Sequence, residues 1–142
     1  MQVQQIMSKD VHIADPNMTI RDAARQMRAE NIGSLPVGEN DQLIGMVTDR
    51  DIVVRAVAEE RSPGNTTVRE VMSEGLCYCF EDDDVERAAQ VMAQHQVRRL
   101  PVVNRNKRLV GVVALADLGR SEDEPAKDAL KGISEPTDKE RR

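Results

Sequence analysis

Apolar residues near the start of the chain recur with the spacing of a helix. Four of them fall at positions i, i+3, i+4 and i+7 and would share one face: Ile20, Ala23, Ala24 and Met27. This spacing predicts a helix that begins at Asn17 or Thr19 and ends at residues 31–33. The short apolar run VHIAD just before it has the length and composition of a strand.

Two further apolar runs follow, and they surround a turn. The runs SLPV and LIGMVT flank the residues GENDQ, whose Gly, Asn and Asp are typical of turns. Residues 34–48 therefore predict a β-hairpin. A second helix is expected from Asp49 to about Ala58, so this part of the chain has the order strand, helix, strand, strand, helix.

The same order of elements occurs a second time. A shift of 65 residues places VQQIMS on VREVMS, and one extra residue in a later turn places GMVTDRD on GVVALAD. The second copy predicts a strand at LCYCF, a helix from Asp84 or Val85 to about Gln96, a hairpin of LPVV and LVGVVA around NRNK, and a short helix from about Leu115. The chain is thus an internal duplication.

The duplication sets the expected domain boundaries. The first repeat covers residues 1–58 and the second covers residues 68–120. Between them, EERSPGNTT at residues 59–67 has the Pro, Gly, Ser and Asn content of a linker. Residues 121–142 form a charged tail, in which residues 126–133 are compatible with a short helix.

Each β-α-β-β-α repeat would expose an apolar sheet face and a helix stripe that it cannot cover alone. Two such repeats, related by a pseudo-twofold axis and packed sheet to sheet, would cover each other and leave a cleft on each side. We therefore expect an α+β fold with paired sites.

Charge, aromatic content and the lengths of the apolar runs indicate which classes of partner are not expected. The formal net charge is −5, the isoelectric point is about 5.1, and aromatic residues make up 1% of the chain. General nucleic-acid binding is therefore not expected. No apolar run approaches the ~20 residues that cross a bilayer, and MQVQQIMSKD lacks the apolar stretch of a secretory signal. We expect a cytoplasmic protein with no membrane partner.

The two cysteines, Cys77 and Cys79, are separated by one residue. Such a pair can supply half of a zinc site, with His95 as a conceivable third ligand, but a complete site needs four ligands. Free structural thiols are the favoured interpretation in a reducing compartment, and a metal or redox site is the alternative.

Three sets of residues give the duplication a family resemblance. They are the openings VxxIMS and VxxVMS, the runs GSLPV and RRLPV, and the phrases GMVTDRD and GVVALAD. In order and spacing over residues 3–120 they resemble a tandem pair of CBS domains, the regulatory module named after cystathionine β-synthase. The chain is most similar to small free-standing bacterial two-CBS proteins, including the hypoxic-response type. The resemblance implies that an adenine nucleotide or another adenosyl compound binds in the cleft between the repeats, and that the protein forms a homodimer.

Two family signatures, GhxP and hxhTxxD, then indicate the ligand site. In the first repeat they match Gly33, Ser34, Leu35, Pro36, Met46, Val47, Thr48 and Asp51. In the second repeat Arg98 replaces the glycine and Ala114 replaces the threonine, whereas Asp117 keeps the carboxylate. We therefore expect a strong site in the first repeat and a weak or silent one in the second.

The chemistry of these side chains fits a nucleotide. The Asp51 carboxylate can accept hydrogen bonds from both ribose hydroxyls, and Thr48 stands at a helix start, where an anion is favoured. Gly33 would let the backbone approach the adenine closely. Thr48 and Asp51 also have the spacing of a helix capping box, a structural role that is compatible with binding.

Three arginines could add positive charge for a phosphate. Arg50 belongs to the first repeat, and Arg98 and Arg99 could reach the first site from across the cleft, serve the second site, or form surface salt bridges.

The expected function is ligand sensing rather than catalysis. The sequence has no phosphate loop with a lysine and no nucleophile beside a base. We expect a regulatory module, with AMP, ADP or ATP as ligand ahead of NAD and S-adenosylmethionine, no required cofactor, and an unidentified protein partner. The alternatives are a metal- or redox-responsive protein and a ligand-free interaction scaffold.

Overall fold

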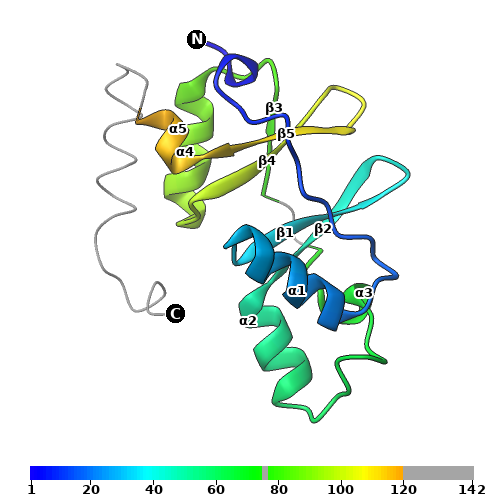
Figure 1. Ribbon diagram of the computed structural model, residues 1–142. Helices are drawn as coiled ribbons and strands as arrows, with labels where there is room; N and C mark the ends of the chain where they lie inside the picture. The colour runs from blue at the N-terminus through cyan, green and yellow to red at the C-terminus, as the bar shows by residue number, and fades with distance from the viewer. Residues whose placement is uncertain (75–76, 120–142) are drawn as a thin grey trace. The chain divides into compact units, whose positions relative to one another are not determined.

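The computed structural model of the chain describes residues 1–74 and 77–119 (Figure 1). The chain divides into two compact units. We call His12–Leu76 the middle unit, and we call Met1–Val11 together with Cys77–Arg142 the terminal unit. The charged tail at 121–142, with the short helix considered at 126–133, lies outside the described residues. Within the described residues, no helix has the length and apolar character needed to cross a membrane.

The middle unit consists of a hairpin and short helices. Its strands are β1 (Ser34–Glu39) and β2 (Gln42–Thr48), and its helices are α1 (Ile20–Glu30), α2 (Asp49–Ile52), the π-helical turn η2 (Val53–Val57) and α3 (Val68–Val71). The strands pair antiparallel, and Asn40 and Asp41 form the turn with φ of 53° and 64°. Two-residue hairpin turns favour these left-handed conformations. The expected hairpin and both expected helices are confirmed.

Helix α1 has clear start and stop signals. Thr19, rather than Asn17, caps it, because the Thr19 hydroxyl oxygen accepts a hydrogen bond from the Asp22 N–H at 3.2 Å. Asn31 ends the helix in the left-handed conformation, with φ of 54°. Ala24, the fourth residue of the predicted apolar face, is exposed.

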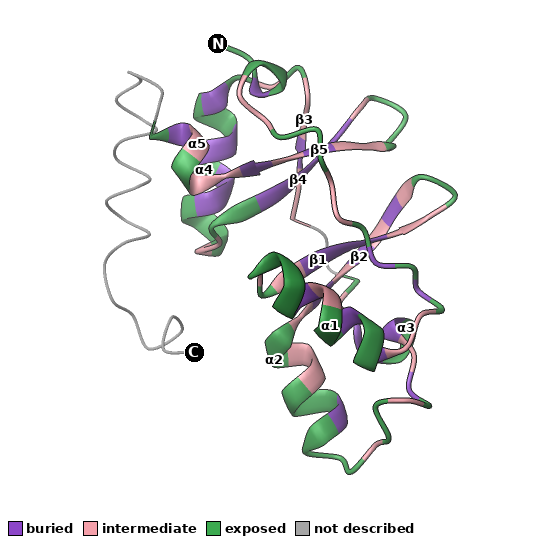
Figure 2. Cartoon of the chain, viewed as in Figure 1, coloured by how far each residue is buried: buried purple, intermediate pink, exposed green. Residues whose placement is uncertain are grey.

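The core of the middle unit joins the helices to the hairpin. In Figure 2 the buried residues gather on the strands, and the hairpin turns are exposed or half-buried. The fully or largely buried residues of this core are Ala14, Ile20, Ala23, Met27, Leu35, Val37, Val47, Ala56, Val68, Val71 and Met72. Small aliphatic side chains thus form the interior, as the near absence of aromatic residues requires.

The terminal unit repeats this architecture. Its elements are the short 3-10 turn η1 (Val3–Gln5), β3 (Cys79–Phe80), α4 (Val85–His95), β4 (Arg99–Val103), β5 (Leu109–Ala114) and α5 (Leu115–Leu118). The sheet has the order β3-β4-β5, in which β3 and β4 are parallel and β4 and β5 are antiparallel. The helix, hairpin and short helix expected in the second copy are confirmed.

The leading strand of each repeat is shorter than the sequence predicts. In the terminal unit, Cys79 and Phe80 form it among the described residues 77–80, and in the middle unit VHIAD is reduced to a single parallel bridge between Ala14 and Val37. The chain turns immediately after Ala14, because the Asp15 carboxylate accepts a hydrogen bond from the Asn17 N–H at 2.8 Å and Pro16 between them has no N–H to donate. An apolar run alone does not reveal this early turn.

The opening segment of each sequence repeat belongs to the compact unit of the other repeat. Residues 67–73 lie in the middle unit, where Thr67 bridges to Thr19 and Ser73 to Met46. Residues 2–8 lie in the terminal unit, in the corresponding place, with bridges from Gln2 to Asp84 and from Ser8 to Val112. The compact units therefore divide the chain after residues 11 and 76, whereas the sequence repeats are separated at residues 59–67.

A glycine in each copy makes room for this opening segment. A Cβ atom on Gly45 would lie 2.8 Å from the Ser73 carbonyl oxygen, and one on Gly111 would lie 2.8 Å from the Ser8 carbonyl oxygen. Both distances are shorter than real Cβ contacts, and the neighbouring atom is backbone that cannot move aside cheaply. The shared glycine of GMVTDRD and GVVALAD is thus explained by close backbone packing.

Candidate nucleotide site

The site residues expected in the first repeat all lie in the middle unit, around the open end of the hairpin. Ser34 lies opposite Thr48 and Pro36 opposite Met46, so these four side chains share one face. Leu35 and Val47 form the next pair, on the other face, and both are fully buried in the core. Leu35 and Val47 are therefore core residues, and only their backbone could contact a ligand.

Thr48 and Asp51 form the expected capping box at the start of α2. The Thr48 hydroxyl oxygen accepts from the Asp51 N–H at 3.0 Å, and Asp51 Oδ2 accepts from the Thr48 N–H at 2.9 Å. The capping interpretation is confirmed. Within the described residues the Thr48 hydroxyl donates no hydrogen bond, so its hydrogen is available to an acceptor that comes from outside.

The second oxygen of Asp51 has a partner that the sequence analysis missed. The Ser73 hydroxyl donates to Asp51 Oδ1 at 3.4 Å. Arg55 donates from Nη1 to the carbonyl oxygens of Val71 and Met72, at 3.0 and 2.9 Å, which joins the same segment to η2. The available signal was the serine that ends both VQQIMS and VREVMS, but the pattern does not indicate which copy of the repeat it contacts.

Gly33 is packed against the side chain of Asp49. A Cβ atom at position 33 would lie 2.9 Å from Asp49 Oδ2, and the Asp49 N–H donates to the Gly33 carbonyl oxygen at 2.9 Å. In the terminal unit the same backbone bond joins the Leu115 N–H to the Arg98 carbonyl oxygen at 2.7 Å. The second copy therefore has Arg98 and Leu115 where the first has Gly33 and Asp49. The glycine of GSLP is explained by its close contact with the Asp49 side chain.

The second copy retains half of the capping box. The Ala114 N–H donates to Asp117 Oδ2 at 2.8 Å, but the Ala114 methyl group has no oxygen with which to accept the reciprocal bond. Asp117 is half-buried and occupies the place in the terminal unit that Asp51 has in the middle unit. The second copy thus keeps the carboxylate of the capping box and lacks the hydroxyl that Thr48 supplies in the first copy.

The three arginines are exposed. Across residues 1–74 and 77–119, the guanidinium groups of Arg50, Arg98 and Arg99 make no ion pair or hydrogen bond. The surface salt-bridge interpretation of Arg98 and Arg99 therefore has no support from the described residues. Arg50 lies in the middle unit with the first site, and Arg98 and Arg99 lie in the terminal unit with Asp117.

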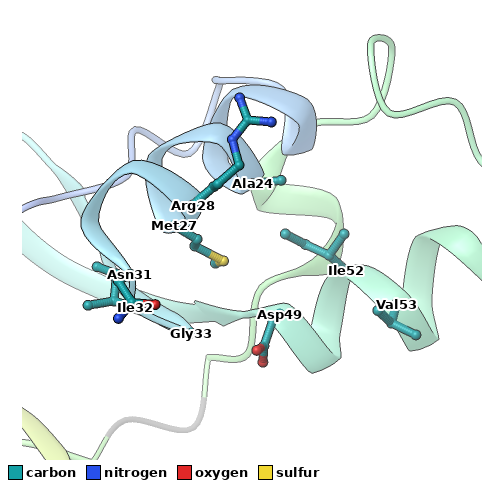
Figure 3. A pocket seen from close by; sticks show the side chains of 9 residues that line it. All are labelled: Ala24, Met27, Arg28, Asn31, Ile32, Gly33, Asp49, Ile52 and Val53. Carbon is teal, nitrogen blue, oxygen red and sulfur yellow. The ribbon is translucent and has the colours of Figure 1, made fainter.

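A separate pocket of about 460 Å³ lies between α1 and α2 (Figure 3). Its lining consists of Ala24, Met27, Arg28, Asn31, Ile32, Gly33, Asp49, Ile52 and Val53. Met27 and Ile52 point toward each other across it, and Arg28 and Asp49 lie on opposite sides (Figure 3). Of the expected site residues only Gly33 lines it, so this pocket is distinct from the Thr48 and Asp51 site.

The two cysteines are free thiols whose surroundings keep them protonated. Cys79 is buried in the core of the terminal unit, where burial, assisted by the negative charge of Asp83, raises its pKa to about 12. Burial also raises the pKa of Cys77. A zinc ligand must be a thiolate, and the described residues contain no group of three His, Cys, Asp or Glu side chains placed to hold a metal ion. The metal alternative of the sequence analysis therefore stays a prediction that a zinc assay must test.

Comparisons with known proteins agree with the two repeats found in the sequence. The CBS domain family profile matches residues 3–57 and 68–120. The CBS domain-containing protein YhcV of Bacillus subtilis is 46% identical over 134 residues, which cover 93% of this chain and 94% of that protein.

Two solved structures add information about fold and ligands. Hypoxic Response Protein I, solved with two coordinated zinc ions, has a TM-score of 0.78 and 36% identity, over 87% of this chain and 100% of that chain. The CBS domain pair of MJ0100, solved with 5′-methylthioadenosine and S-adenosyl-L-methionine, has a TM-score of 0.72 and 30% identity, over 84% of this chain and 94% of that chain. The chain belongs to the CBS domain family, as a tandem pair of CBS domains of the kind found in hypoxic response proteins.

Proposed function

We propose that this protein is a regulatory module that binds an adenine nucleotide or another adenosyl compound at the Thr48 and Asp51 site of the middle unit. The observation that carries the proposal is the capping box at the start of α2. It holds a carboxylate and a hydroxyl side by side, with the Asp51 carboxylate able to accept further hydrogen bonds and the Thr48 hydroxyl able to donate one.

The surroundings of the capping box support a nucleotide. Ser34 and Met46 are half-buried on the same hairpin face as Thr48, and Met46 offers an apolar surface of the kind a nucleobase requires. The exposed Arg50 supplies a cation without a partner among the described residues. The adenosyl ligands of the MJ0100 pair support the ligand class, and AMP, ADP and ATP are the first compounds to test, before NAD and S-adenosylmethionine.

The proposal assigns no catalytic role. YhcV, of which this chain covers 94%, is described by its CBS domains alone. A regulatory ligand acts by binding one arrangement of the protein better than another. We therefore propose that ligand binding changes the conformation of the protein and that a separate protein partner in the cytoplasm recognises this change.

The proposed module is a homodimer that forms through the face of α1, α2 and η2. Val53, Val54 and Val57 are 55%, 47% and 59% exposed, and the apolar pocket between α1 and α2 adjoins Val53. A twofold interface joins the same patch on both subunits. Arg28 and Asp49 lie on opposite sides of the pocket, so a twofold contact could pair Arg28 of each subunit with Asp49 of the other.

Thermal unfolding with AMP, ADP, ATP, NAD and S-adenosylmethionine tests the ligand proposal. Ligand at about 100 times Kd stabilises the native state by ~2.7 kcal/mol, which raises the unfolding midpoint by roughly 10 °C in a chain of this size. Asp51→Asn should abolish the shift, because it keeps an oxygen for the Thr48 N–H but removes the carboxylate. Asp117→Asn is the matched control and should retain it.

The absence of a shift with all five compounds in wild-type protein would contradict the proposal. The zinc content of the purified protein, measured before and after chelation, would then separate the metal-responsive alternative from the ligand-free scaffold.

A further inference from the structure

Ser73 contacts the proposed site although it lies outside both family signatures. Its hydroxyl donates to Asp51 Oδ1 at 3.4 Å, while the Thr48 N–H donates to Asp51 Oδ2 at 2.9 Å. The two donors therefore hold the two oxygens of one carboxylate. Ser73 belongs by sequence to the opening segment of the second repeat, and by packing to the middle unit.

The backbone fixes the position of Ser73 independently of its hydroxyl. The Ser73 N–H donates to the Met46 carbonyl oxygen at 2.8 Å, and the Met46 N–H donates to the Ser73 carbonyl oxygen at 2.9 Å. Gly45 allows this close approach, and Arg55 binds the two preceding carbonyl oxygens. Removing the Ser73 hydroxyl should therefore delete one hydrogen bond and leave the backbone in place.

The remaining hydrogen-bonding capacity of Asp51 matches a particular ligand group. A carboxylate has about four acceptor positions, two on each oxygen. The Thr48 N–H and the Ser73 hydroxyl each occupy one, on different oxygens. One position remains on each oxygen, which is what two hydroxyls on adjacent carbons require. A single hydroxyl needs only one of them.

We infer that Ser73 is a positioning residue that fixes the plane of the Asp51 carboxylate and so gives the site its preference for a vicinal diol over a single hydroxyl. The inference rests on the proposed function, since it assigns a specificity to the same site. With Ser73 absent, the carboxylate is held at Oδ2 alone and can rotate away from the orientation in which both oxygens face the ligand.

Calorimetric titration with AMP, ADP and ATP and with their 2′-deoxy analogues tests the inference. Wild-type protein should prefer the ribonucleotide. In Ser73→Ala the affinity for the ribonucleotide should fall about two- to tenfold, because the Asp51 side chain must then be ordered when the ligand binds, and the affinity for the 2′-deoxy compound should change less than twofold. Ser73→Thr keeps the hydroxyl and should restore the preference.

Two controls separate positioning from loss of structure. Ser8→Ala removes the equivalent serine from the terminal unit and should leave both affinities unchanged. The second variant is Ser73→Cys, which keeps the shape of the serine side chain but replaces its hydroxyl with a weak donor. The unfolding midpoint of each variant without ligand shows whether the fold is retained.

The outcomes distinguish the inference from the function on which it rests. If wild-type protein binds a ribonucleotide through Asp51 and Ser73→Ala keeps the wild-type preference, the inference is wrong and the proposed function stands. If Ser73→Ala weakens the ribo and deoxy compounds equally, Ser73 does not set the preference. If wild-type protein binds none of the compounds, both fail.

Discussion

At the scale of single residues, comparing the two copies of the repeat shows which residue differences occur together. Gly33 and Asp49 in the first copy correspond to Arg98 and Leu115 in the second, with the same backbone hydrogen bond in both. The glycine in the first copy leaves space that the Asp49 carboxylate fills. The pair is therefore best treated as one feature.

A double-mutant cycle tests this coupling. Gly33 has no positive φ, so alanine fits the backbone and its cost arises from the contact with Asp49. We expect Gly33→Ala to lower the free energy of unfolding by about 1 kcal/mol, the cost of moving a side chain off its rotamer. In the Asp49→Ala background the same change should cost nothing or stabilise the protein. Equal costs in both backgrounds, measured by denaturant unfolding, would show that the two residues are independent.

At this scale the sequence predicted side-chain chemistry better than side-chain orientation. Thr48 and Asp51 could be predicted because a capping box is local, with its partners three residues apart. The core positions of Leu35 and Val47 and the contact of Ser73 with Asp51 could not, because strand register and contacts between residues 22 apart decide them. The family resemblance gave Gly33 a ligand role, and the sequence did not reveal its contact with Asp49.

At the scale of elements, hydrophobic periodicity predicted both long helices and both hairpins. Periodicity did not predict the short elements, or predicted them to be longer than they are. The expected strand at VHIAD is a single bridge, and the opening segments contain the turn η1 and the one-turn helix α3, which the sequence analysis did not predict. Runs of three or four residues carry too few positions to establish a period, and their structure depends on the backbone partners that they find.

The start of α2 has a structural and a proposed ligand role that one experiment can separate. Thr48→Ala removes the cap and should lower the free energy of unfolding by ~0.5–2 kcal/mol, with or without ligand. If the Thr48 hydroxyl also binds phosphate, the variant should lose more affinity for AMP than for adenosine. Thr48→Ser should restore both properties. Equal losses for AMP and adenosine would leave Thr48 with the capping role alone.

At the scale of the whole molecule, the exposed valines of η2 test the proposed homodimer. Val57→Glu places a charge on the most exposed of them and should convert a dimer to a monomer, because a buried unpaired charge is costly. Light scattering after size-exclusion chromatography gives the mass directly. Ile13→Glu, which alters an exposed apolar residue outside α1, α2 and η2, is the matched control. A monomeric wild-type protein would contradict the proposal.

The internal duplication predicted that the molecule has two similar parts but not how the chain is shared between them. The openings VQQIMS and VREVMS have the same residue at three of their six positions and a similar residue at a fourth, so their sequences do not show which compact unit each one joins. The answer depends on the exact packing around Gly45 and Gly111. Local patterns contain no information about such a choice between equivalent partners.

The exchange of opening segments has a consequence for synthesis on the ribosome. The middle unit is complete as soon as residue 76 has emerged, because all its residues are consecutive. The first 11 residues must wait for the described partners between residues 77 and 119. At ~5–20 residues per second, the roughly 110 residues in between take about 5–20 s to translate. The start of the chain is therefore among the last parts of the protein to find its place.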